Sequence, residues 1–174
     1  EDIDQQTQVK STSSHLHKLF LILENLLKEE PPSRQTSVAN VLHQVAEKIH
    51  KRSLVIIFSD MFENQDETSQ IFSALQHLKH NRHEVMLFHV TDHRTELNFE
   101  FEERPYEFID MERGERLKLQ PSQVREAYQK YVSEYFHELE IRCGQAKIDF
   151  VTADINQGFD QVLRSYLIKR ASMK

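Results

Sequence analysis

A length of 174 residues fits one domain that can bury a sizeable core. The 22 lysine and arginine residues and 28 aspartate and glutamate residues give a net charge of -6, which is the wrong sign for a nonspecific binder of nucleic acid or anionic lipid. A single cysteine argues against a disulfide framework and favours a reducing compartment, so we expect a cytoplasmic protein. No apolar run reaches the roughly 18 residues of a membrane span, so no membrane insertion is predicted.

Two amphipathic helices are predicted at the amino-terminal end. The preceding segment Ile3–Val9 is only weakly strand-like. Ser13 or Ser14 suits the N-cap of a first helix, which ends before two prolines, and Thr36 is predicted to begin a second helix. The apolar residues at helical spacing are Leu16, Leu19, Phe20, Leu23, Leu26 and Leu27 in the first helix, and Val38, Val41, Leu42, Val45 and Ile49 in the second.

The stretch from Leu54 to Glu63, LVIIFSDMFE, is the one around which the chain is organised. Its five consecutive apolar residues, Leu54–Phe58, are typical of a strand that is covered on both faces, so we expect this strand to be central in the native fold. It ends at Ser59 and Asp60. Ligand and metal sites of open α/β sheets lie at the carboxyl ends of the strands, so these two residues are the first candidates for function.

A second apolar run, Val85–Val90, follows a helical pattern formed by Ile71, Leu75 and Leu78. Two buried strands joined by a helix form a βαβ unit, so the strands are predicted to be parallel.

Beyond Asp92 the pattern changes to period two. Leu97, Phe99 and Phe101 alternate with polar residues, which predicts a half-exposed strand. Tyr106–Asp110 and Arg116–Leu119 flank a turn at Gly114 and are predicted to form a hairpin.

The longest helix is predicted to begin at Pro121 and to end at Gly144 in the left-handed conformation. Lys147–Thr152 is the last predicted core strand, and a closing helix carries Phe159, Val162, Leu163, Tyr166 and Leu167. The fold class is therefore α/β: a three-layer, mainly parallel sheet with helices on both faces and an edge hairpin insertion.

Four segments, in this order along the chain, resemble the bacterial family called domain of unknown function fifty-eight. They are RQTSVANVLHQVAEKIHKRSLVIIFSDMFE, HEVMLFHVTDHRTELNFEF, QPSQVREAYQKY and KIDFVTADINQGFDQVL. The resemblance implies a Rossmann-like fold similar to the von Willebrand factor A domain. Residues 1–174 would then be a single domain of this type, truncated at the amino terminus.

The resemblance also implies a metal-ion-dependent adhesion site. By position its ligands would be Thr36 and Asp60, with Ser59 beside the acid. Their hard oxygen atoms suit Mg²⁺. The Asp-x-Ser-x-Ser loop of such sites does not occur in the sequence, and Gln35 replaces the usual small residue before Thr36. We therefore expect an incomplete site that binds Mg²⁺ in the intact protein and not in this chain alone.

Two strands of the parent fold would also be missing, which would leave Leu54–Phe58 at a sheet edge. An unprotected apolar edge pairs readily with other strands. From the resemblance we therefore expect this chain to dimerise or aggregate.

Three functions remain open. The leading hypothesis is a noncatalytic protein-interaction domain, and the resemblance implies MoxR-type AAA+ ATPases as partners. The rival is a metal-dependent phosphoester hydrolase, which requires Asp60 to converge with Asp92 and Asp154. The third is a structural subunit without metal.

The ten histidines and the cysteine have simpler interpretations than catalysis. His77, His80 and His83 could share one side of a helix, but no cysteine or carboxylate completes a zinc tetrahedron, so we interpret them as surface residues. His89 lies within a strand and is predicted to be a hydrogen-bonded core residue. Cys143 is predicted to be a buried residue at a helix end rather than a nucleophile.

Overall fold

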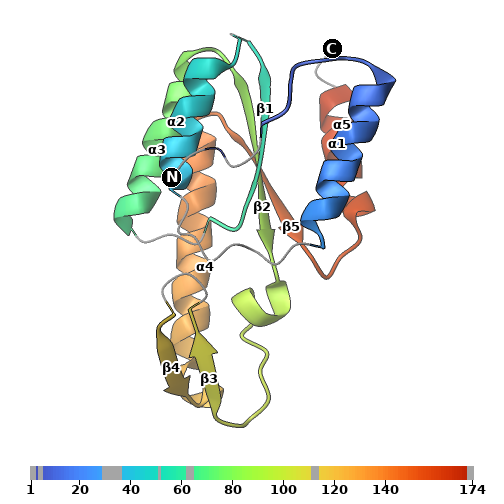
Figure 1. Ribbon diagram of the computed structural model, residues 1–174. Helices are drawn as coiled ribbons and strands as arrows, with labels where there is room; N and C mark the ends of the chain where they lie inside the picture. Colours follow the sequence, from blue (N-terminus) through green and yellow to red (C-terminus); the bar gives the residue numbers. More distant parts are fainter. Residues whose placement is uncertain are drawn as a thin grey trace.

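The computed structural model describes residues 3, 6–28, 37–50, 52–61, 65–110 and 114–171. In these residues, a three-stranded parallel sheet in the order β1-β2-β5 forms the centre of the molecule. Helices α2, α3 and α4 lie on one side of the sheet, and α1 and α5 lie on the other (Figure 1). The strands are β1 (Leu54–Ser59), β2 (Glu84–Thr91) and β5 (Asp149–Asp154), and the helices are α1 (Ser13–Leu26), α2 (Val38–Lys48), α3 (Gln65–His80), α4 (Pro121–Gln145) and α5 (Phe159–Ala171). The predicted α/β class and parallel strand pairing are confirmed.

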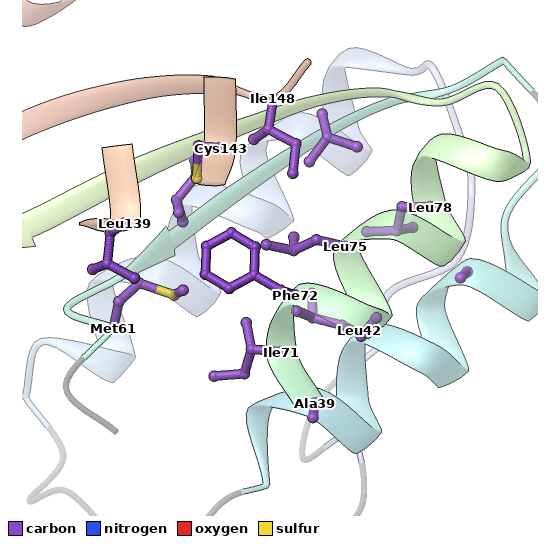
Figure 2. Close-up of a cluster of buried hydrophobic side chains, with 14 residues drawn as sticks. Ala39, Leu42, Met61, Ile71, Phe72, Leu75, Leu78, Leu139, Cys143 and Ile148 are labelled. Atoms are coloured by element: carbon purple, nitrogen blue, oxygen red, sulfur yellow. The ribbon is translucent and has the colours of Figure 1, made fainter. Parts of the chain in front are cut away.

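The core lies between the sheet and the α2, α3 and α4 side. Strand β2 is its centre, because it pairs with β1 on one edge and β5 on the other and is buried without interruption from Val85 to His89. Figure 2 shows the side chains of Phe72 and Leu75 of α3 in one buried cluster with that of Leu139 of α4. The apolar stripe of α3 was correctly predicted, since Ile71, Leu75 and Leu78 are all fully buried.

The sequence predicts a central position for β1 in the native fold and, from the family resemblance, an edge position in this chain. No other described strand pairs with its outer edge, so β1 is an edge strand. Val55 and Ile57 pack against the core, whereas Leu54, Ile56 and Phe58 face the α1 and α5 side and are 38%, 44% and 69% exposed. An apolar run indicates that a strand tolerates burial, but it does not supply the neighbouring strand. The apolar edge that the family resemblance implied is thus present.

The predicted strand through Leu97, Phe99 and Phe101 is also wrong. His93–Leu97 forms one turn of π-helix, η1, and the chain then runs irregularly to the hairpin of β3 (Tyr106–Ile109) and β4 (Arg116–Leu119), which was predicted correctly. Phe99 adopts a positive φ of 52° and is buried, with its ring 4.5 Å from that of Tyr128. The period-two pattern therefore reflects an aromatic cluster that anchors the hairpin to α4.

The structure differs from the prediction at the start of α2, in the segment Ile3–Val9 and at the end of α4. Thr36 lies outside the described residues, and α2 begins at Val38 with Ser37 as its N-cap. The described residues of Ile3–Val9 contain no strand. Gly144 does not end the long helix, because α4 continues to Gln145 and Lys147 takes the left-handed conformation instead, with a φ of 55°. Within the described ranges, no helix is both long and apolar enough to cross a membrane.

Candidate functional site

The turn that follows β1 is held by contacts from three directions. The Oγ atom of Ser59 accepts a hydrogen bond from the backbone N–H of Met61 at 3.1 Å. The hydroxyl of Tyr135 on α4 donates to the Met61 carbonyl oxygen. Met61 has a positive φ of 53° and buries its side chain in the core (Figure 2). The turn therefore has a defined shape, and the side chain of Asp60, between two anchored residues, is left exposed to solvent.

The third contact comes from the central strand. The Nε2 atom of His89 lies 2.8 Å from the backbone carbonyl oxygen of Asp60. A carbonyl oxygen can only accept, so Nε2 carries the proton. The Nδ1 atom is buried without a hydrogen-bond partner, and the ring packs edge-on against Phe136, 4.4 Å between centroids. Burial lowers the pKa of His89, although the Asp60 carbonyl and carboxylate act in the opposite direction. The predicted core role of His89 is thus confirmed.

Asp60 lies on an open cavity of about 560 Å³ at the carboxyl ends of β1 and β2. Two further acids, Asp92 and Glu96, line the same cavity. Its remaining wall includes the exposed apolar side chains of Phe58 and Ile155. The cavity therefore combines negative charge with apolar surface.

Asp92 ends β2 and caps η1. Its Oδ1 atom accepts hydrogen bonds from the backbone N–H groups of Arg94 and Thr95, at 3.0 and 3.4 Å, and from the side-chain amide of Asn156 at 2.6 Å. These bonds, that of Asn156 first, lower the pKa of Asp92. Its carboxylate thus has a structural function as a helix cap.

Asp154 occupies the corresponding position at the end of β5. Its Oδ1 atom accepts from the side-chain amide of Asn156 at 3.1 Å and from the backbone N–H of His93 at 3.3 Å. Burial acts to raise the pKa of Asp154, but the hydrogen bonds from Asn156 and His93 outweigh it and the pKa is lowered. Asn156 therefore bridges Asp92 and Asp154 with one amide group.

Glu96 returns a bond to the residue that caps its own helix turn. Its Oε2 atom accepts from the backbone N–H of Asp92 at 3.0 Å. Burial raises the pKa of Glu96, and the negative charges of Asp60 and Asp92 act in the same direction, against the hydrogen bond. The carboxylates of Asp60, Asp92 and Glu96 at the rim of the cavity thus repel one another, and a positively charged group bound there would be stabilised.

The described part of this site does not fit the implied magnesium ion. The Ser59 hydroxyl is bonded to the turn, Asp60 contributes one carboxylate, and the predicted ligand Thr36 lies outside the described residues. Among the described side chains, no group of three or more histidines, cysteines, aspartates or glutamates could hold a metal ion. Asp60, Asp92 and Asp154 therefore do not form the cluster that a two-metal or phosphoester site requires.

The other residues considered for metal binding or catalysis lie outside this cavity. His77 of α3 pairs with His43 of α2, 3.3 Å between Nδ1 atoms, and His83 is buried, with its Nδ1 accepting from the Ser53 backbone N–H. His83 is thus not a surface residue, in contrast to its predicted position. Cys143 is fully buried, as predicted, and burial raises its thiol pKa to about 11.

Sequence reasoning identified Asp60 and missed Glu96 and Asn156. The sequence did contain a signal for these contacts. An aspartate at the start of a turn typically accepts hydrogen bonds from backbone N–H groups a few residues later, as a helix cap or Asx turn. The segments Asp92-His93-Arg94 and Asp154-Ile155-Asn156 fit this pattern. The bridging of the two turns by one amide depends on the neighbouring positions of β2 and β5.

One comparison with known proteins bears on this chain. The family model described as "Protein of unknown function DUF58" matches residues 3–138. No curated protein and no solved structure is significantly similar to the chain.

Proposed function

The chain belongs to the DUF58 family of proteins of unknown function, and from this premise we propose that it is a noncatalytic protein-interaction domain of the von Willebrand factor A type. The observation that carries the proposal is the exposed carboxylate of Asp60, presented by an anchored turn on the rim of a cavity. Binding at the carboxyl ends of parallel strands is the general rule for open α/β sheets.

The chemistry of the rim favours recognition over catalysis. Asp92 and Asp154 accept several N–H donors each and serve to cap turns. Asp60 and Glu96 are left to face the cavity. A basic side chain of a partner protein would relieve the repulsion between these two acids, and an adjacent apolar group would cover Phe58 and Ile155.

The partner implied by the family resemblance is a MoxR-type AAA+ ATPase. In the intact protein a Mg²⁺ ion would add to the contact if Thr36 and segments beyond this chain supplied further oxygen ligands. The rival hypothesis of a phosphoester hydrolase needs Asp60, Asp92 and Asp154 to converge on a metal ion. Asp92 and Asp154 instead accept hydrogen bonds from Asn156 and from the N–H groups of their turns, which favours the interaction hypothesis.

The direct test is binding of the full-length protein to a purified MoxR-type ATPase, measured by calorimetry. Asp60→Asn keeps the size of the side chain and removes its charge. We expect affinity to fall about tenfold or more, because a hydrogen bond to a charged group contributes roughly 1.5–3 kcal/mol. Glu126→Gln, at an exposed position of α4, is the matched control and should bind as the wild type does.

Two outcomes would count against the proposal. Equal binding by wild type and Asp60→Asn would remove Asp60 from the interface, and turnover of a phosphoester that depends on Asp60 would replace binding with catalysis. A parallel titration with Mg²⁺ separates the metal question. Heat that appears with wild type and is absent with Asp60→Ala would support a cation-assisted contact, and two identical null traces would leave a contact without metal.

A further inference from the structure

Two histidine rings meet between the helices α2 and α3. His43 lies in the middle of α2 and His77 in the last turn of α3, 34 residues apart in the sequence. Their Nδ1 atoms are 3.3 Å apart, and the two ring planes are inclined by 44°. Both residues are half-buried. The two Nδ1 atoms therefore point into the same small space between the helices.

The packing of the two helices holds this separation. Figure 1 shows α2 and α3 side by side, and Figure 2 shows Leu42 of α2 and Leu78 of α3, each the neighbour of one of the histidines, in one buried cluster. The side-chain amide of Asn81, just beyond α3, donates to the backbone carbonyl oxygen of Ala46 at 3.1 Å. Closely packed interiors resist displacement, so a ligand between the two rings meets preformed geometry.

Both rings can present a lone pair at Nδ1. A neutral imidazole carries one proton, on either of its nitrogens. Within the described chain, the Nε2 atoms of His43 and His77 make no hydrogen bond to another residue, so each is free to carry the proton and to bond to water. In that tautomer the hydrogen bond between the rings is lost, and both Nδ1 atoms are available to one shared cation.

The separation of the Nδ1 atoms selects the type of cation. Zn²⁺ binds histidine nitrogens at about 2.0–2.1 Å, so two ligands at the tetrahedral angle are about 3.3–3.4 Å apart. At the right angle of a square-planar or octahedral site they would be about 2.8–3.0 Å apart. The observed 3.3 Å agrees with the tetrahedral value. The pair therefore suits Zn²⁺ better than Cu²⁺ or Ni²⁺.

We propose that His43 and His77 bind a zinc ion through their Nδ1 atoms, with water at the remaining positions. In the described part of the chain, no third histidine, cysteine, aspartate or glutamate joins them. Structural zinc sites have four protein ligands and catalytic sites have three, so this site binds zinc more weakly and exchanges it. The last turn of α3 adds to the attraction, because the negative end of a helix dipole stabilises cations.

A zinc ion at this pair would join α2 to α3 in the folded state alone. The unfolded chain does not hold two histidines 34 residues apart at this distance, so the ion stabilises the folded form as its free concentration rises above the dissociation constant. We therefore expect Zn²⁺ to raise the melting temperature. The inference does not depend on the proposed partner function.

The first test is a calorimetric titration of the purified full chain with Zn²⁺. Wild type is expected to bind one ion saturably. His43→Asn and His77→Asn should each weaken binding at least about tenfold, because losing even an outer-shell partner of a zinc ligand costs 10- to 100-fold. The asparagine amide leaves a hydrogen-bonding group near the place of Nδ1. His80→Asn, at an exposed position of the same helix as His77, is the matched control and should bind as wild type does.

Three outcomes of the titration would overturn the proposal. They are a wild type without saturable heat, a wild-type affinity in either variant of the pair, and an equal loss in the His80→Asn control. The chain is titrated without a partner protein and without Mg²⁺, so this test can fail while the binding test with the ATPase succeeds, and the reverse.

The second test needs no substitution. Long-range ¹H–¹⁵N spectra of the wild-type chain distinguish the two nitrogens of each imidazole ring. Addition of Zn²⁺ should shift the Nδ1 resonances of two histidines. Shifts confined to Nε2 resonances would reject the geometry proposed here, because only the Nδ1 atoms of His43 and His77 lie at the ligand separation.

Discussion

The imidazole of His89 donates a hydrogen bond across two neighbouring strands to the backbone carbonyl oxygen of Asp60, at 2.8 Å. The residue that carries the exposed acid is therefore positioned by a buried neutral ring of the central strand. This contact joins the turn that carries Asp60 to the core, so substitutions in the core around His89 should alter the position of Asp60.

The first prediction concerns pH. Burial lowers the pKa of His89 below its ordinary value of 6.5, so below about pH 6.5 the unfolded chain binds a proton that the folded chain does not. The contribution of His89 to the free energy of unfolding is thus complete above pH 6.5 and is lost as the pH falls. Urea denaturation at about pH 7.5 and 5.5 should show this loss.

His89→Gln is the control for the pH prediction, because its amide can still donate to Asp60 and does not titrate. It should show a smaller loss of stability between the two pH values than wild type. An equal loss in both proteins would show that His89 is not the source of the effect.

The second prediction concerns the turn after β1. Tyr135→Phe removes the donor to the Met61 carbonyl oxygen and should lower the free energy of unfolding by about 1 kcal/mol. Tyr131→Phe is the matched control, because Tyr131 is an exposed neighbour on the same helix. Chemical denaturation measures both, and a Tyr131 effect as large as that of Tyr135 would contradict the proposed function of the hydroxyl.

The third prediction concerns two glycines in opposite situations. Gly144 lies within α4, and a methyl group there would meet no atom within 4 Å. Gly144→Ala should therefore stabilise the protein by roughly 0.5–1 kcal/mol. Gly114 has a φ of 70°, so Gly114→Ala should destabilise it. Thermal denaturation of both variants measures the two effects. If the melting temperature of both variants shifts in the same direction, the backbone conformation at one of the two glycines is not the one described here.

The fourth prediction concerns the thiol. Cys143 is fully buried and its pKa is raised to about 11, so at pH 8 it should react with a thiol reagent far more slowly in the folded protein than in urea. Absorbance of the released chromophore follows the reaction. Rapid stoichiometric labelling of the folded protein would show that the thiol is accessible and would contradict its burial in the core.

The sequence by itself determined the local elements. The apolar runs of β1 and β2, the 3.6-residue stripes of α2 and α3 and the proline at the start of α4 depend on nearby residues alone, and each was correctly located. It also identified Asp60 at a strand end and His89 and Cys143 in the core. The family was indicated by the order of several segments, and the match over residues 3–138 shows it.

Tertiary structure alone decided which neighbours these elements have. Burial of β1 on one face, the π-helical turn in place of a strand near Phe99, and the bridge from Asn156 to Asp92 and Asp154 all depend on contacts between residues far apart in the chain. Periodicity records which face of an element can be apolar. It contains no information on how many strands pair with an element, because strand pairing is set by the whole packed chain.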